Sequence, residues 1–296
     1  MNFFEKIKLV LKQPGILLRY RSFELRKLYF YLSKYLHLKT FLSRKKNINY
    51  QSNLYNNGFE KIETETLNKN KININSIIIE IEKKIKNLDY SNQSSHLKSI
   101  KISEIFDTNS NIFNFLTSDY LINIVSEYLG CVPILTYSSV WYSKNNEIIN
   151  NSSQEYHLDH EDYKQVKGFL YLEDINENNG AMNLFSKKNS KEVIRRIDYR
   201  TSPDKKRLKD DFFSKYEDEK IVCEGKKGTL YLVDTSNCFH CGARKSTKSR
   251  LLMTFQFITP WANYLNWNWK KSEILKRNIW KIKDINDTQK KIIGLK

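Results

Sequence analysis

Residues 155–185 of the chain read EYHLDHEDYKQVKGFLYLEDINENNGAMNLF. Short runs of aliphatic and aromatic residues are separated here by Asn-Gly and charged turns, which is typical of short strands. The same pattern recurs through the second half of the chain and predicts strands over residues 134–142, 155–160, 166–172, 180–185, 220–223, 228–233 and 250–257. Before Gly130 the apolar residues repeat at helical spacing instead. We therefore expect a mainly β fold with helical flanks, built as an antiparallel sandwich or a jelly roll.

His157 and Asp159 are two residues apart in one of these predicted strands. Side chains at positions i and i+2 of a strand project from the same face, so this imidazole and this carboxylate could bind one metal ion together. His240 is the natural third ligand, because it lies in the predicted turn after the strand over residues 228–233. Two histidines and one carboxylate leave three positions of an octahedral ion open, which is typical of non-haem Fe(II) oxygenases.

An isolated His-x-Asp pair is common, and most such pairs are surface residues or hydrogen-bonded core residues. The chain has only five histidines, however, and two of them fall where a metal site would need them. His160 is the rival ligand, but strand alternation directs it away from His157 and Asp159. We expect His160 to contact one of the metal-binding side chains without binding the metal itself, or to face the substrate at the end of the strand.

Arg250 opens the last predicted strand, ten residues after His240, and Thr254 shares its face of that strand. A guanidinium inside a small barrel is costly unless an anion meets it, and its planar fork suits a carboxylate. A co-substrate with two carboxyl groups could therefore chelate the metal at one end and meet Arg250 at the other. The alternative is a surface arginine in the company of Arg244 and Lys248.

With these residues identified, the chain resembles the phytanoyl-CoA dioxygenase family, a branch of the Fe(II)/2-oxoglutarate oxygenases. The resemblance extends from about residue 55 to about residue 260 and depends on the order and spacing of short motifs. These motifs are Asn57-Gly58-Phe59, Tyr120–Gly130, Pro133-Ile-Leu135, His157-Leu-Asp159, Phe169-Leu-Tyr-Leu-Glu-Asp174, Asn178-Asn-Gly-Ala-Met182, Gly228-Thr-Leu, Asp234, His240-Cys-Gly242 and Arg250. The chain departs from the family at Ser186-Lys-Lys-Asn189, where relatives often carry Pro-Gly-Ser-His, so the mouth of the pocket is expected to differ.

The resemblance implies a double-stranded β-helix, the cupin-like form of the jelly roll. It also implies that His157, Asp159 and His240 bind Fe(II), and that Arg250 holds the distal carboxylate of 2-oxoglutarate. Ser139 and Thr254 are expected beside this co-substrate. The residues expected to line the substrate pocket are Tyr137, Trp141, Phe169 and His160.

The implied activity is that of a dioxygenase, which uses O₂ to hydroxylate an unactivated C–H bond of a small-molecule or lipid-like substrate. Asp159 favours hydroxylation over halogenation, because related halogenases lack this carboxylate. One alternative is a non-catalytic binding protein on the same fold that docks to a membrane or an acidic partner through its basic N-terminus. Another is a Zn(II) hydrolase with the same three ligands.

Three regions are predicted along the chain. Residues 1–50 form a basic amphipathic helical extension, with twelve Lys and Arg residues against two acids. Residues 55–265 form the double-stranded β-helix domain, in which residues 187–219 are dense in charge and are expected as an insertion or a lid. Residues 266–296 form a C-terminal helical tail.

The N-terminal extension carries a leucine stripe at helical spacing, formed by Leu25, Leu28, Leu32 and Leu36. Such a helix could lie on a membrane, but we expect the stripe to pack against the protein's own body. Because the excess positive charge is in this extension, no nucleic-acid binding by the main body is expected, and the extension would instead suit anionic lipid or an acidic partner. No early segment is typical of a secretory signal, and the four cysteines are expected to be reduced. We therefore expect a cytoplasmic protein, with peripheral contact to the inner membrane face as an option.

Overall fold

The computed structural model describes residues 23–46, 52–86, 97–101, 110–145, 153–199, 207–242, 244, 246–262 and 284–294. Residues 1–22 of the predicted extension and residues 266–283 of the predicted tail lie outside these ranges. The division of the chain into an extension, a domain and a tail stays a prediction.

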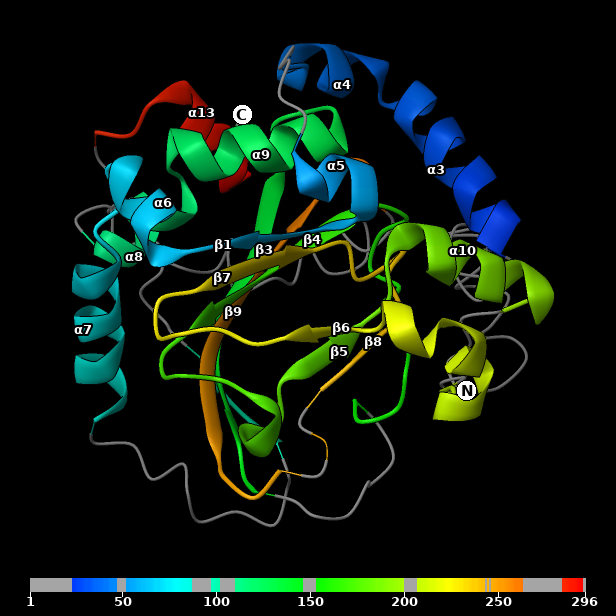
Figure 1. Ribbon diagram of the computed structural model, residues 1–296. Coiled ribbons are helices and arrows are strands. Elements are labelled where there is room, and N and C mark those ends of the chain that lie inside the picture. Colours follow the sequence, from blue (N-terminus) through cyan, green and yellow to red (C-terminus); the bar gives the residue numbers. More distant parts are fainter. Residues whose placement is uncertain are drawn as a thin grey trace, which may run out of the picture.

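Two antiparallel sheets form the centre of the molecule (Figure 1). The larger sheet has the strand order β1-β7-β4-β9-β3-β2, and the smaller has the order β6-β5-β8. The strands are β1 Phe59–Ile62, β2 Leu97–Lys101, β3 Ile134–Ser143, β4 Gln165–Tyr171, β5 Met182–Leu184, β6 Ile221–Cys223, β7 Leu230–Val233, β8 His240–Cys241 and β9 Arg250–Ile258. The expected mainly β jelly roll with helical flanks is confirmed.

Helices cover the outside of the larger sheet, and a second group lies beside the smaller sheet (Figure 1). The α-helices are α3 Phe23–Leu36, α4 Leu38–Arg44, α5 Asn53–Asn57, α6 Thr64–Lys69, α7 Ile74–Ile85, α8 Asn111–Leu116, α9 Asp119–Leu129, α10 Lys187–Arg196 and α13 Asp287–Ile292, with 3-10 helices η1 Glu177–Asn179 and η2 Asp210–Glu219. Helix α9 begins and ends as its sequence predicts, because the Ser118 side chain accepts a hydrogen bond from the Leu121 N–H and Gly130 is left-handed. Helix α7 begins after Asn73, whose side chain accepts a hydrogen bond from the Ser76 N–H.

Strand alternation in β4 and β9 separates the hydrophobic core from the interior between the sheets. Leu170 of β4 and Phe255 of β9 pack outward against helix residues such as Ile81 and Phe115. Neighbours on the opposite face of the same strands therefore point between the two sheets. Gly168 leaves room for the Phe255 ring of the paired strand, because a Cβ atom at this position would lie 2.0 Å from Cζ of Phe255.

The strand predicted over residues 155–160 is the main error in the expected secondary structure. Only two isolated bridges form there, between Tyr156 and Leu208 and between His157 and His240. Beyond His157 the chain turns away from strand geometry, and the Asp159 N–H donates instead to the Thr235 carbonyl at 2.8 Å. His240 was predicted to lie in a turn, but it lies in the short strand β8.

Residues 187–219, expected as a charged insertion or lid, contain α10 and η2. Both helices bury apolar side chains, among them Val193 and Phe213, in a cluster with Tyr156 and Phe239. The two helices therefore pack against the residues that precede His157 and His240.

Helix α3 packs against the protein body with the face opposite to the one we expected. Its buried residues are Phe23, Arg26, Phe30 and Ser33, whereas the stripe of Leu25, Leu28, Leu32 and Leu36 is exposed. The expectation that the leucines pack on the protein's own body is therefore wrong. Among the described residues, no helix combines the length and the apolar character needed to cross a membrane.

The close approach at Gly168 gives a direct test of this packing. Gly168→Ala should lower the free energy of unfolding by about 1–3 kcal/mol, because the new methyl group overlaps the Phe255 ring. Urea denaturation would measure the loss. The double variant Gly168→Ala/Phe255→Leu should recover part of it, and an unchanged stability of Gly168→Ala would contradict the close contact.

Candidate metal centre

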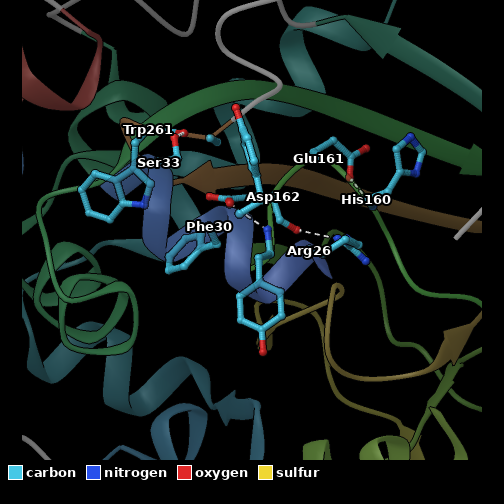
Figure 2. Close-up of a pocket in the computed structure, with 10 residues that line it drawn as sticks. Arg26, Phe30, Ser33, His160, Glu161, Asp162 and Trp261 are labelled. Carbon is cyan, nitrogen blue, oxygen red and sulfur yellow. Dashed lines mark hydrogen bonds between the residues drawn. The ribbon is translucent and has the colours of Figure 1, made fainter. Parts of the chain in front are cut away.

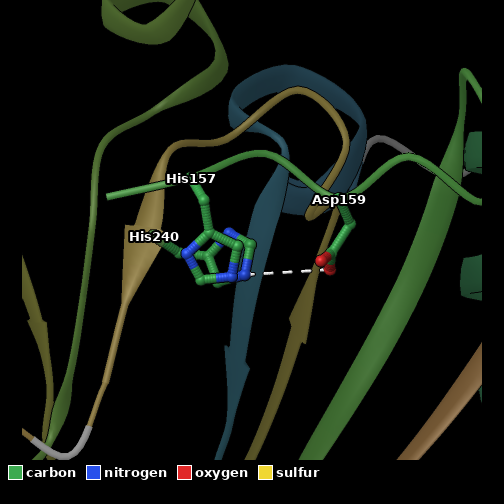
Figure 3. Close-up of side chains that lie close together, drawn as sticks. All are labelled: His157, Asp159 and His240. Atoms are coloured by element: carbon green, nitrogen blue, oxygen red, sulfur yellow. Dashed lines mark ion pairs between the residues drawn. The ribbon is translucent and has the colours of Figure 1, made fainter. Parts of the chain in front are cut away.

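A reciprocal backbone pair brings the two histidines together (Figure 3). The His157 N–H donates to the His240 carbonyl at 3.1 Å, and the His240 N–H donates to the His157 carbonyl at 3.2 Å. Directly opposed residues of an antiparallel pair project to the same side. The two imidazole rings accordingly lie with their centroids 4.3 Å apart.

Each imidazole is oriented by a carbonyl of its own chain segment. Nδ1 of His157 lies 2.9 Å from the Glu155 carbonyl oxygen, and Nδ1 of His240 lies 3.0 Å from that of Cys238. A carbonyl can only accept, so each Nδ1 carries the hydrogen and each Nε2 keeps a free lone pair. Burial lowers the pKa of both rings, which favours the neutral form that binds metals.

Asp159 completes the group from the loop that follows His157. Its Oδ2 lies 3.7 Å from Nε2 of His240, and the candidate ligand atoms of the three residues all lie within 4.8 Å of one another. Burial alone would raise the pKa of Asp159, but the ammonium of Lys167, which also donates a hydrogen bond to the carboxylate, holds this pKa below its usual range. The carboxylate is thus ionised and ready to bind a cation.

Lys167 is the site residue that sequence reasoning missed. Its ammonium lies 2.7 Å from Oδ2 of Asp159, the same oxygen that faces His240. Burial disfavours the charge of Lys167, yet the Asp159 carboxylate raises the pKa of the lysine well above its usual value. The signal was present in the sequence, because Lys167 is two residues before Phe169, the pocket residue predicted on the same strand.

The donor set fits a divalent transition metal. Two imidazole nitrogens and one carboxylate oxygen converge from one side and leave the other side to the cavity described below. Two histidines and one carboxylate are the donor set of facial non-haem Fe(II) sites, although Zn(II) also accepts such ligands. A metal at Oδ2 of Asp159 would compete with the Lys167 ammonium for that oxygen.

A cavity of about 170 Å³ joins the three candidate ligands to Arg250. Nη1 of Arg250 donates to the Gly180 carbonyl, and Nη2 lies 3.4 Å from Oγ of Ser143. Its Nε is buried and has no hydrogen-bond partner among the described residues. Burial lowers the pKa of Arg250, so an anion in the cavity would relieve a real cost.

The cavity collects most of the residues predicted to surround the site. Tyr137, Trp141, Phe169 and Thr254 all line it together with the three candidate ligands and Arg250. It is also lined by residues that we did not predict, namely Leu97, Ser153, Lys167, Tyr171, Met182, Gly242 and Leu252. The apolar members form a wall that limits access of water.

Ser139 and His160 are not among the lining residues of this cavity. Ser139 is buried within the larger sheet, where it lies opposite Thr254 of β9. His160 instead lines a second cavity against α3, together with Arg26 and Asp162 (Figure 2). Its placement was mispredicted because strand alternation does not extend beyond His157.

No protein-family model matches the chain, and no curated protein matches it in sequence. Among solved structures, it is similar to EctD from S. alaskensis with bound Fe, at 12% identity over 73% of this chain and 80% of that chain, with a TM-score of 0.49. It is also similar to the epimerase SnoN in complex with Fe³⁺, alpha ketoglutarate and nogalamycin RO, at 10% identity over 70% and 80% of the two chains, with a TM-score of 0.47. A third similar structure is HygX from Streptomyces hygroscopicus with nickel, 2-oxoglutarate and hygromycin B bound, at 16% identity over 70% and 85%, with a TM-score of 0.45. What this chain binds must be inferred from its own side chains.

Because His240 is a candidate ligand and His160 is not, their substitution should affect metal binding differently. His240→Ala should weaken Mn(II) binding by more than about a hundredfold, because even the loss of a residue behind a ligand can cost that much. His160→Ala is the matched control and should bind Mn(II) like the wild type. Calorimetric titration of the metal-free protein would measure both, and an equal loss in the two variants would contradict the assigned group.

Removal of the Lys167 charge should have the opposite effect and raise the affinity for the metal. Lys167→Met keeps the apolar stem but removes the ammonium, so the metal no longer competes for Asp159. Mn(II) affinity should rise by about tenfold, which corresponds to about 1.4 kcal/mol. A fall in affinity would show instead that Lys167 holds the carboxylate in place for the metal.

Proposed function

We propose that the protein is an Fe(II)- and 2-oxoglutarate-dependent dioxygenase that hydroxylates an unactivated C–H bond of a small-molecule or lipid-like substrate. One observation carries the proposal. The His157, Asp159 and His240 group and the buried guanidinium of Arg250, with an Nε that has no partner among the described residues, line the same cavity. A ligand that bridges the two needs a metal-binding end and an anionic end, as 2-oxoglutarate has.

The three ligands would hold Fe(II) through Nε2 of each histidine and a carboxylate oxygen of Asp159. Arg250 would bind the distal carboxylate of 2-oxoglutarate, because its fork can donate two parallel hydrogen bonds to such a group. When bound, iron and 2-oxoglutarate would supply the oxidising power, by coupling O₂ activation to oxidative decarboxylation that yields succinate and CO₂. Thr254 and Tyr137 line the same cavity and could orient either molecule.

The remaining lining residues would position the substrate and exclude water. Trp141, Phe169 and Leu252 give the cavity an apolar wall, suited to a C–H-rich substrate. Asp159 occupies the position that a halide would need, which favours hydroxylation over halogenation. Lys167, displaced from Asp159 by the metal, would keep its charge within the cavity and could meet an anionic group of the substrate.

A non-catalytic binding protein on the same fold is the second candidate. The observation that favours it is the ion pair of Lys167 with Asp159, which satisfies the carboxylate without any metal. In that case the cavity would take an organic anion through Arg250 alone. The two candidates differ in whether 2-oxoglutarate meets a metal.

Absorption spectroscopy without oxygen separates the two candidates. Fe(II) and 2-oxoglutarate added to the wild-type protein should give the visible charge-transfer band of a keto acid bound to iron. The band should be lost in His157→Ala and weakened in Arg250→Ala, whereas it should persist in Arg244→Ala, whose guanidinium pairs with Asp210 outside the cavity. A folded wild-type protein without the band would refute the oxygenase proposal and favour the binding protein.

A further inference from the structure

The outer face of α3 and α4 carries most of the exposed apolar side chains in the described part of the protein. Of the ten large hydrophobic residues that are exposed there, eight lie on these two helices. We call them the Leu/Tyr stripe: Leu25, Leu28, Tyr31, Leu32, Tyr35, Leu36, Leu38 and Leu42. Their exposed fractions range from 40% to 72%, so the stripe is an apolar surface of the kind that marks an interaction site.

The inner face of α3 is fixed to the body, so the stripe cannot turn inward. Nη2 of Arg26 donates to the Asp162 carbonyl at 3.0 Å, and the Ser33 hydroxyl donates to the Trp261 carbonyl at 2.8 Å. Phe30 packs between them against Tyr163, with ring centroids 5.4 Å apart. Figure 1 accordingly shows α3 and α4 on the outside of the molecule, without another described element on their outer side.

The charges around the stripe favour an anionic partner. Residues 23–46 contain seven Lys and Arg residues and one acid, Glu24. Arg26 and Arg44 are buried and donate to carbonyls of the body, whereas Lys27, Lys39 and Lys45 are exposed. A second copy of the chain would bring the same positive charges together, so self-association is disfavoured.

We propose that α3 and α4 dock in the plane of an anionic lipid bilayer. Leucines would enter the boundary between headgroups and acyl chains, tyrosines would lie at the headgroup level, and the exposed lysines would meet lipid phosphates. The aliphatic and aromatic composition of the stripe, flanked by lysines, is that of an interfacial helix rather than of a protein-binding groove.

Docking of this kind would place the membrane against the wall of the protein that carries the candidate metal ligand. The residue that fixes α3, Arg26, donates to the carbonyls of Asp162 and Asp159 within the same loop. The loop that supplies Asp159 therefore rests directly on the docking helix. Lipid binding itself requires neither metal nor 2-oxoglutarate, so its test is independent of the proposed function.

Vesicle flotation of the full chain tests the proposal. The wild-type protein should float with vesicles of phosphatidylcholine mixed with an equal amount of phosphatidylglycerol, and should float much less with phosphatidylcholine alone or at high salt. Leu28→Ser/Leu32→Ser should weaken flotation by at least about tenfold, because apolar area no longer enters the bilayer. Both side chains are at least half exposed, so the variant should remain folded, as circular dichroism can verify.

Ile79→Ser is the matched control, because Ile79 is as exposed as Leu32 but lies on α7. It should float like the wild type. Lys27→Glu/Lys39→Glu should lose the preference for anionic vesicles. A wild-type protein that stays at the bottom of the gradient would overturn the proposal. The stripe would then be covered by another part of the chain or by a second copy, and a dimer that Leu28→Ser/Leu32→Ser dissociates would identify the second case.

Discussion

The site depends on one reciprocal pair of backbone hydrogen bonds, between His157 and His240. These residues are far apart in the sequence, and only their pairing places two imidazole rings side by side. Strand β8 is held in turn by β5, where Leu184 lies opposite His240. A carbonyl near each Nδ1 then fixes which nitrogen can bind a metal, so backbone geometry alone determines the direction of both histidine ligands.

The charge of the cavity is the second constraint, because it limits which ligands can bind. Two cationic side chains line the cavity in addition to the candidate metal ligands. Arg250 lies on β9 and Lys167 on β4, and among the described residues of the cavity only Lys167 has a carboxylate partner, Asp159. A buried cation without a carboxylate partner is costly, so the cavity as a whole favours anions. The dicarboxylate of the proposed reaction would satisfy Arg250, and a metal would compete with Lys167 for Asp159.

Much of the fold could be predicted from the sequence wherever strands are regular. Alternation placed Thr254 on the same face of β9 as Arg250, and the family resemblance placed Phe169 of β4 at the pocket; both line the cavity. The same rule failed for His160, because the chain leaves strand geometry after His157. Ser139 lies opposite Thr254 and shares a face with Tyr137, as alternation predicts, but it is not among the residues that line the cavity.

The N-terminal helix shows a different limit of sequence reasoning. A leucine stripe predicts an apolar face, but it does not say whether that face turns toward the protein or away from it. Arg26 decides the matter in α3, because carbonyls of the loop from Asp159 to Asp162 receive its guanidinium and turn the leucines outward. Such partners are set by tertiary structure, and no pattern within the helix reveals them.

The central claim is that one cavity holds a metal at His157, Asp159 and His240 and a dicarboxylate at Arg250. The most direct measurement is a crystal structure of the protein with Mn(II) and 2-oxoglutarate, with anomalous scattering used to locate the metal. The account predicts a manganese peak among the three side chains, Lys167 displaced from Asp159, and keto-acid density that ends at the Arg250 guanidinium. Manganese at another position, or the Lys167–Asp159 pair intact beside an empty cavity, would contradict it.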